Sequence, residues 1–350
     1  MKLLRTLQKK EKYSTPPIWF MRQAGRYLPE YRNIRSKEGN FLNLCYNPKL
    51  ASEITLQPIK RFGFDGAILF SDILVIPDAL GIKTEFIKNF GPKLQNISTE
   101  QDLDKLKLNN IKNHLNPVFE AIDIIKSTKP KKTNLIGFSG SPWTIATYII
   151  EGGSSKNFEK TRSIAIQNEI FFQKLIDILI DSIIEYLSYQ IEAGVEIIQL
   201  FDSWSGILPE SQFEKWVLNA NKKIIDNVKN KYPEIPIILF TKGAGILNEN
   251  ICKNINFDCL AIDQNLPKNW VKENIQNKYN KIIQGNLDNI LLCYGSKDDI
   301  KKEVLSILSN FNEKEFVFNL GHGVLKETPI ENIELVLNII NNYKCNPLCN

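Results

Sequence analysis

Histidine and cysteine are scarce in this sequence, with 2 and 6 residues among 350. A secreted disulfide scaffold would carry cysteine at a far higher density, so we expect reduced thiols and a cytoplasmic protein. Neither histidine lies within a few residues of a cysteine. A closed zinc site, which uses His and Cys thiolate ligands, is therefore not expected. The roles of Cys345 and Cys349, in a short C-terminal tail at 344–350, stay open.

Long apolar runs and concentrated charge are also missing. Acidic residues interrupt the most apolar predicted helix, around 176–187, and no apolar segment precedes Lys9 and Lys10, so we expect neither a membrane span nor a signal peptide. The net charge is +5, but the lysines are scattered, which predicts a solvated surface and no nucleic-acid partner. Walker-type and G-x-G-x-x-G phosphate loops are absent, so nucleotide-dependent activities have no support.

The sequence does contain short β-branched or aromatic runs that alternate with longer helical patterns. These runs have continuous apolar character, which is typical of strands buried on both faces. The predicted strands are 17–21, 65–70, 134–138, 196–201, 236–240, 258–262, 281–284 and 315–320. The predicted helices are 48–59, 167–193, 209–231, 267–278, 298–310 and 329–342, with a shorter one near 248–253.

Eight buried strands alternating with helices predict an α/β protein built as a single (β/α)8 (TIM-type) barrel, with an open doubly wound sheet as the alternative. The largest interruption follows strand two, at about 73–133. Gly81 and Gly91 suggest a small hairpin there, and 99–127 has a helical pattern. No Gly, Ser or Pro linker divides the chain, so we predict one catalytic domain over 1–350.

Polar residues follow nearly every predicted strand at the same end, which in a βα barrel is the end that carries the site. In chain order they are Arg22 and Arg26; Ser71 and Asp72; Ser139, Gly140, Trp143 and Tyr148; Asp202 and Ser203; Thr241 and Lys242; Asp263; Asn286 and Asp288; and His322. This regularity predicts a catalytic mouth at that end.

The first of these segments is rich in arginine. The run 17–21 stops at Arg22, Arg26 follows, and Gly25 between them lets the backbone turn freely. Guanidinium groups bind carboxylates or phosphates bidentately. Surface ion pairs are the alternative interpretation, but Glu30 is the only acid nearby. The segment therefore predicts a polyanionic small-molecule substrate.

Five segments, in this order, resemble the uroporphyrinogen decarboxylase family. They are MRQAGRYLPEYR at 21–32, FSDI at 70–73, GFSGSPWTIATY at 137–148, FDSW at 201–204 and NLGHG at 319–323. The resemblance covers about 16–343, essentially the whole chain. Segments of ten or more residues with mixed Arg, Gly and aromatic content rarely arise by chance.

The resemblance implies a barrel that forms a homodimer with facing clefts. It also implies removal of CO2 from the four acetate side chains of uroporphyrinogen III, giving coproporphyrinogen III in haem biosynthesis, with no metal or organic cofactor. The substrate-binding residues that it implies are Arg22, Gln23, Ala24, Gly25, Arg26, Arg35, Asp72, Phe138, Gly140, Tyr148, Phe201, Ser203 and His322. Phe138 and Gly140 match positions whose backbone amides lie near the substrate.

The chemistry fits Asp72 independently. Decarboxylation of a pyrrole-linked acetate needs an electron sink, which ring protonation creates as an iminium-like cation. A carboxylate near the ring nitrogens would stabilise that charge. The alternative is that Asp72 only caps the loop or helix after it. The proton donor stays open among Arg22, a weak acid, and Tyr148 and His322, which donate more easily. His114 is expected at the surface.

Two other functions stay open. A corrinoid-linked methyltransferase would share the fold but needs zinc, which this sequence has few ligands to hold. A catalytically silent tetrapyrrole-binding or scaffold protein would keep the arginines and lose the carboxylate, whereas Asp72 is present.

Overall fold

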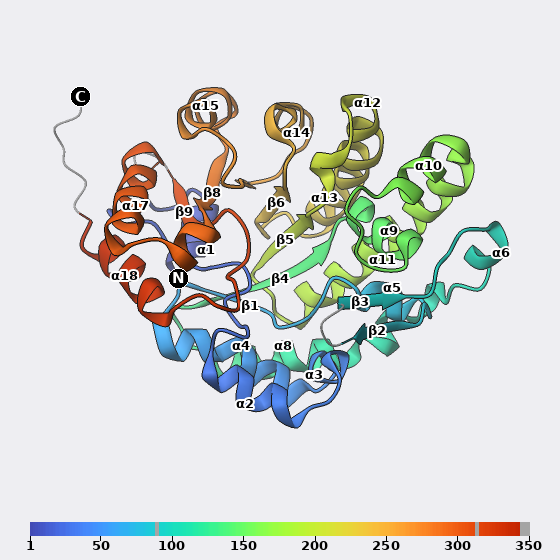
Figure 1. Cartoon of the computed structure of the whole chain (residues 1–350), viewed down its shortest axis with the longest axis horizontal. Helices are drawn as coiled ribbons and strands as arrows, with labels where there is room; N and C mark the ends of the chain where they lie inside the picture. The colour runs from blue at the N-terminus through green and yellow to red at the C-terminus, as the bar shows by residue number, and fades with distance from the viewer. Residues whose placement is uncertain (88–90, 312–314, 344–350) are drawn as a thin grey trace.

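The structure is a computed structural model that describes residues 1–87, 91–311 and 315–343. Its main feature is a parallel sheet of seven strands in the order β1-β4-β5-β6-β7-β8-β9. The strands are β1 (Gly66–Ile68), β4 (Asn134–Gly140), β5 (Ile197–Asp202), β6 (Ile237–Thr241), β7 (Cys259–Ala261), β8 (Ile282–Leu287) and β9 (Phe316–Leu320). Strand neighbours in the sheet are also neighbours in chain order, apart from β2 and β3, and helices lie around the strands (Figure 1).

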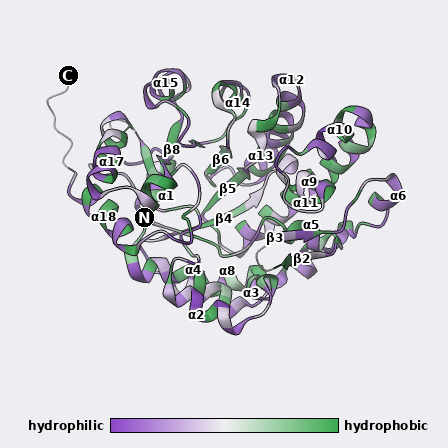
Figure 2. Ribbon diagram, viewed as in Figure 1, coloured by the Kyte–Doolittle hydropathy of each residue, from purple (hydrophilic) through white to green (hydrophobic). Residues whose placement is uncertain are grey.

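The strands are almost entirely buried, and Figure 2 shows hydrophobic residues concentrated on them while polar residues face outward on the helices. Every residue of β1, β4, β6, β7, β8 and β9 is buried. Continuous burial on both faces explains why the sequence showed unbroken apolar runs rather than alternation. The prediction of an α/β protein with a parallel sheet is therefore confirmed.

The first predicted strand, 17–21, is not a regular strand. Ile18 forms a single parallel bridge with Phe318 of β9. The N–H of Ile18 donates instead to the Asp65 carboxylate at 2.9 Å, and Pro17 has no N–H to offer. The backbone N–H of Asp65 in turn donates to the Ile18 carbonyl at 2.9 Å. The segment thus contacts both β9 and the residue before β1 without a continuous ladder.

Helices cover the sheet between the strands. The longer ones are α2 (Pro29–Lys37), α4 (Pro48–Phe62), α8 (Asn116–Thr128), α9 (Pro142–Glu151), α10 (Glu159–Gln167), α11 (Glu169–Ala193), α13 (Asn219–Lys231), α17 (Lys297–Phe311) and α18 (Ile330–Asn341). The shorter ones are α1 (Lys2–Leu7), α3 (Phe41–Cys45), α5 (Val75–Ala79), α6 (Glu100–Leu103), α7 (Ile111–His114), α12 (Glu210–Phe213), α14 (Asn248–Asn254), α15 (Lys268–Val271) and α16 (Asn289–Tyr294).

The predicted helix 167–193 begins two residues later than expected. Asn168 lies between α10 and α11, and its side chain accepts a hydrogen bond from the N–H of Phe171 at 3.3 Å. An asparagine that caps a helix in this way ends the preceding one. Predicted helix 209–231 contains a π-helical segment at Glu214–Leu218, and predicted helix 267–278 contains one at Lys272–Asn277.

Between β1 and β4 the chain forms a two-stranded antiparallel hairpin, β2 (Thr84–Ile87) and β3 (Gly91–Leu94), followed by α6, α7 and α8. The C-terminal tail at 344–350, with Cys345 and Cys349, lies outside the described residues. Among the described residues, no helix combines the length and apolarity needed to cross a membrane.

Candidate active site

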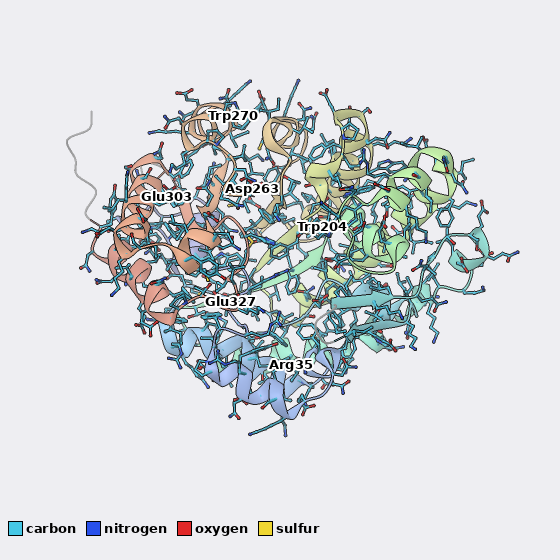
Figure 3. All side chains as sticks on the ribbon, viewed as in Figure 1. Arg35, Trp204, Asp263, Trp270, Glu303 and Glu327 are labelled. Atoms are coloured by element: carbon cyan, nitrogen blue, oxygen red, sulfur yellow. The ribbon has the colours of Figure 1, made fainter. Side chains whose placement is uncertain are left out.

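The carboxyl ends of the parallel strands lie at one edge of the sheet, and the polar residues expected there follow these ends. Asp72 lies shortly after β1, Lys242 directly after β6 and His322 shortly after β9. Trp204, after β5, and Asp263, after β7, lie over the middle of the molecule in Figure 3. Parallel strands thus bring residues from distant parts of the chain to one opening.

A tight loop holds Arg22 beside His322. The Arg22 backbone has a φ of 59°, in the left-handed region that few residues other than glycine adopt. Its side chain lies directly over Gly323, where an added Cβ would be 2.4 Å from Arg22 Cδ. The N–H of Val324 donates to the carbonyl of Met21 at 3.0 Å. Gly323 therefore leaves the space that lets the guanidinium side chain pass next to His322.

Gln23 fastens this loop to the sheet. Its side chain is fully buried; the Nε2 donates to the carbonyl of Gly66 in β1 at 2.9 Å, and the Oε1 accepts from the N–H of Phe20 at 3.0 Å. The Tyr27 hydroxyl donates to the Gln23 carbonyl at 2.6 Å. The side chain of Gln23 thus positions the half-buried Ala24 and Gly25 and the flanking arginines, and its expected contact with the substrate stays a prediction.

Three predicted arginines have no carboxylate partner among the described residues. Arg22 and Arg26 are exposed, and the half-buried Arg35 donates only to main-chain carbonyls. Glu30, the one acid nearby, pairs instead with Arg61 through contacts of 2.8 and 2.9 Å. Figure 3 places Arg35 near α2 and α3. The guanidinium groups are therefore available for the carboxylates of a ligand.

Asp72 has one oxygen engaged and one open. Its Oδ1 accepts the N–H of Leu74 at 2.9 Å, in a turn that precedes α5. Its other oxygen has no hydrogen bond to a described residue. Burial raises the pKa of Asp72 to about 6, opposed by the Leu74 hydrogen bond and by the charge of Arg22. The capping interaction considered from the sequence thus engages only Oδ1 of Asp72, and Oδ2 is left for a ligand.

Gly140 lets β4 approach the loop that carries Asp72. A Cβ at Gly140 would lie 2.9 Å from the Cβ of Ile73, the residue after Asp72, which is closer than real Cβ contacts. Any side chain at 140 would push Ile73 and its neighbour away. The structure therefore gives Gly140 a positioning role in addition to the expected contact with substrate.

Tyr148 lies within electrostatic reach of both Asp72 and Arg22. It belongs to α9, and its ring centroid is 6.4 Å from that of Trp204. Burial raises the pKa of Tyr148; contact with Trp204 opposes the rise, the charge of Asp72 adds to it and that of Arg22 opposes it. The phenol is thus protonated at neutral pH and can donate a hydrogen bond. Ser203, half-buried nearby in sequence, has a hydroxyl with no hydrogen bond to a described residue.

His322 is held as a neutral imidazole. Its ring stacks on Phe240 with a centroid distance of 6.4 Å, and its buried Nδ1 has no hydrogen-bond partner among the described residues. Burial, with added repulsion from Arg22 and Lys242, lowers the pKa of His322 to about 3. The imidazole can therefore hydrogen bond to a ligand, but it carries no extra proton to deliver at neutral pH. This weakens its candidacy as the proton donor.

Aromatic rings pack against one another at this end of the sheet. Phe201 contacts Phe138 and Phe240 edge-on, with ring centroids 5.7 and 6.2 Å apart. The backbone N–H of Phe138 was expected near the substrate; here it donates to Gln190 Oε1 at 3.0 Å, and its closeness to the substrate stays a prediction. With this N–H engaged inside the protein, the ring is the part of Phe138 that we expect to contact a ligand.

His114 lies apart from this opening and is half-buried rather than at the surface. Its Nε2 is 2.7 Å from Asp78 Oδ2, which also accepts the Tyr46 hydroxyl at 2.7 Å. The cluster ties α7 and the residue after α3 to α5.

Comparison with known proteins agrees with this geometry. The model of the family "Uroporphyrinogen decarboxylase (URO-D)" matches residues 1–343. A uroporphyrinogen decarboxylase of Rickettsia bellii is 45% identical over 330 residues, covering 94% of this chain and 95% of that protein. One of Orientia tsutsugamushi is 47% identical over 330 residues, covering 93% and 94%.

The chain belongs to the uroporphyrinogen decarboxylase family. Solved structures at lower identity share the fold alone. A methyltransferase from Methanosarcina mazei has a TM-score of 0.75 at 16% identity and covers 98% of both chains. A B12-independent methionine synthase from Shewanella has a TM-score of 0.54 at 11% identity and covers 94% of both.

The methyltransferase alternative needs a zinc site. The described residues of this family member provide no cluster of side chains that could bind zinc. Nowhere among those residues do three His, Cys, Asp or Glu side chains gather closely enough to hold a metal ion. The cysteines at 45, 252, 259 and 293 are buried and unpaired. Burial raises the pKa of the thiols of Cys45, Cys252 and Cys259, which disfavours the thiolate that zinc requires.

Sequence reasoning noticed Lys242, Asp202 and Asp263 at strand ends but gave them no role in this decarboxylase. The structure shows why each matters. Asp202 is fully buried in a hydrogen-bond network, and Asp263 is 2% exposed and binds two backbone N–H groups. Lys242 is half-buried at the opening itself. Their position directly after strands was the available signal.

Proposed function

We propose that this member of the uroporphyrinogen decarboxylase family removes CO2 from the four acetate side chains of uroporphyrinogen III, giving coproporphyrinogen III in haem biosynthesis. The observation that carries the proposal is Asp72, whose second oxygen is open, next to Arg22, which lacks a carboxylate partner. A macrocycle with pyrrole N–H donors at its centre and carboxylates on its rim matches both features.

The reaction needs a place for two electrons. When an acetate loses CO2, the electron pair of the broken C–C bond must enter the pyrrole ring. A proton added to that ring beforehand makes it an iminium-like cation that accepts the pair. A second proton then converts the exocyclic methylene to a methyl group, while the ring returns its first proton. Asp72 accepts hydrogen bonds from the pyrrole N–H groups and stabilises the cation in a low-dielectric site.

Of the three candidate proton donors, Arg22, Tyr148 and His322, the protonation states count against His322. His322 is neutral at neutral pH, with its pKa lowered to about 3 by burial. Tyr148 stays protonated because burial raises its pKa, and it lies within the electrostatic reach of Asp72. We expect Tyr148 and His322 to hydrogen bond to substrate carboxylates, together with Ser203. Arg22, Arg26 and Arg35 form ion pairs with other carboxylates of the rim.

The proposal extends to the finer architecture of the chain. We infer a closed (β/α)8 barrel in one domain, because segment 17–21 contacts both β9 and the residue before β1. The insertion then spans about 73–133. A homodimer with facing clefts is supported by large apolar side chains exposed after β6 and β8, namely Ile246, Ile290 and Tyr294. The unpaired thiols support a reducing, cytoplasmic location.

The direct test is anaerobic incubation of the purified chain with uroporphyrinogen III, followed by oxidation and chromatography of the porphyrins. We expect the eight-carboxylate species to be replaced by the four-carboxylate one through intermediates, with the same rate after treatment with a chelator. Binding without any loss of carboxylates would instead identify a silent tetrapyrrole-binding protein. Zinc at about one per chain, with chelator-sensitive methyl transfer, would favour the methyltransferase alternative.

A further inference from the structure

Lys242 is fixed at the opening by its backbone. Its N–H donates to the carbonyl of Asp202 at 3.1 Å, and its own carbonyl accepts from Gly206 N–H at 3.0 Å and from Ser205 Oγ at 3.1 Å. The next residue, Gly243, has a φ of 76° and packs against Gly206 so closely that a Cβ on Gly206 would lie 2.4 Å from the Gly243 backbone. The backbone position from which the Lys242 side chain extends is therefore tightly constrained.

The ammonium group has protein around it but no anion bound to it. Lys242 is half-buried, and its Nζ lies 5.8 Å from the centroid of the Trp204 ring. No carboxylate lies within ion-pair distance and no hydrogen-bond acceptor is found for Nζ among the described residues. A partly desolvated ammonium group without an anion is unfavourable, and a ligand carboxylate would relieve that cost.

The nearby acid is already occupied. Asp263 is the carboxylate whose charge acts on Lys242, but its Oδ2 accepts the N–H of Gly243 at 2.6 Å and its Oδ1 accepts that of Asn265 at 2.9 Å. Asp263 thus holds the loops after β6 and β7 and does not pair with the lysine. Its role is to position the backbone on which Lys242 stands.

Two further polar groups lie within electrostatic range of Lys242. Arg22 and Lys242 interact electrostatically, although β7 and β8 separate β6 from β9, the strand that segment 17–21 contacts. Both cations also act on His322, whose buried Nδ1 has no partner. Two like charges and an unpartnered imidazole around one space are the arrangement that a carboxylate would satisfy.

We infer that Lys242, together with Arg22 and His322, forms a subsite for one carboxylate side chain of the substrate. The inference rests on the proposed function for the identity of the ligand. Lys242 is the new member, and its role is to bind and orient the macrocycle rather than to act on the reacting acetate. The Trp204 ring lies near both the Lys242 ammonium group, at 5.8 Å, and the ring of Tyr148, at 6.4 Å between centroids.

The test compares Lys242→Met, which removes the charge at similar length, with Lys242→Arg, which keeps it. The control is Lys223→Met on α13, which makes the same change in net charge at an exposed ion pair with Asp177. We expect Lys242→Met to raise the KM for uroporphyrinogen about tenfold, the low end of what a charge-assisted hydrogen bond contributes, with kcat less affected. Lys242→Arg restores most of the affinity, and Lys223→Met stays near wild type.

A KM for Lys242→Met within about twofold of the Lys223→Met control would overturn the inference. So would an equal rise in KM for the Arg and Met variants, because a purely structural lysine is not rescued by charge. Thermal unfolding of each variant shows whether the fold is retained. If the wild-type chain does not decarboxylate uroporphyrinogen, the proposed function fails; quenching of tryptophan fluorescence by oxidised uroporphyrin then still tests whether Lys242→Met weakens binding.

Discussion

Asp72, which is half-buried, and Asp202, which is fully buried, both lie at or after the carboxyl end of a strand, and they differ in their surroundings. Burial raises the pKa of each to about 6. Asp202 has both oxygens engaged: Thr144 donates to Oδ1 at 2.6 Å and Asn221 donates to Oδ2 at 3.1 Å. Asp72 has one hydrogen bond from a backbone N–H, and Arg22 nearby. Altered acidity alone therefore does not separate a reactive carboxylate from a structural one.

The polar neighbours show the same contrast. Around Asp202 the network is closed, because Thr144 also accepts the N–H of Trp204 at 3.2 Å and Ser141 donates to Asn221 Oδ1 at 2.7 Å. Beside Asp72, the buried hydroxyls of Ser71 and Tyr186 make no hydrogen bond of ordinary geometry with a described residue. An unsatisfied buried polar group is uncommon in natural proteins, and a ligand or an ordered water is one way to satisfy it. The contrast supports the proposal that Asp72 takes part in the chemistry, whereas Asp202 belongs to a closed structural network.

The largest effect is expected from Asp72→Asn. The amide keeps the shape of the side chain but cannot stabilise a cation, so kcat should fall about a thousandfold. The free energy of unfolding at pH 7.5 should stay the same or rise, because the variant no longer buries a charge. Steady-state decarboxylation and urea unfolding measure the two quantities on the same preparation.

Asp202→Asn is the matched control for that variant, since it neutralises a carboxylate of similar pKa that has no open oxygen. We expect it to keep kcat within about tenfold of wild type. Equal losses of kcat in the two variants, or near-normal turnover by Asp72→Asn, would contradict the assignment of roles.

Removal of the Asp202 side chain should act on stability first. Asp202→Ala leaves the hydroxyl of Thr144 and the amide of Asn221 buried without their acceptor, which costs about 2 kcal/mol in the free energy of unfolding. The midpoint of urea unfolding should fall accordingly, and by less in Asp202→Asn, which keeps one acceptor oxygen. Activity should fall moderately, because the network holds α9, which carries Tyr148. An unchanged midpoint would show that the network is dispensable.

Much of the fold could be predicted because its signals are local. Strands such as 134–140 and 316–320 are mostly apolar, and the sheet buries them on both faces. Segment 17–21 has the same character, but its hydrogen bond goes to the side chain of Asp65, which only the folded chain brings near. The boundary at Asn168 had a visible signal, since asparagine is a preferred helix cap.

In the site, too, some features could be predicted from the sequence and others depend on contacts between distant residues. The position of Asp72 and His322 follows from the rule that barrel sites lie after the strands. The amide of Phe138 is taken by Gln190, which is 52 residues away in the chain, and no local pattern reports such a contact. Lys242 is a second case. Its ammonium group has no carboxylate partner because the nearby Asp263 accepts hydrogen bonds from two backbone N–H groups, which no local sequence pattern reports.

The smallest expected effect is a difference between the two Asn variants in how kcat/KM depends on pH. Asp72 must be ionised to accept pyrrole N–H groups, so kcat/KM should fall about tenfold per unit as pH drops below its pKa of about 6. The charged or titratable groups that act on Asp72 are Arg22, Tyr148, Tyr186 and Cys45, and only Arg22 is ionised near that pH. The acid limb should persist in Asp202→Asn and disappear from the residual activity of Asp72→Asn.

Stability should move in the opposite direction over the same range. For both aspartates the folded pKa of about 6 lies above the ordinary value of 3.8, so the folded state holds protons more tightly than the unfolded chain. Their contribution to stability is therefore fully present below about pH 4 and is lost as pH rises through about 6. Either Asn variant should flatten this dependence in urea unfolding measured from pH 4 to 7. Only Asp72→Asn should flatten the activity profile as well, since the charge at 72 meets the substrate and the charge at 202 does not.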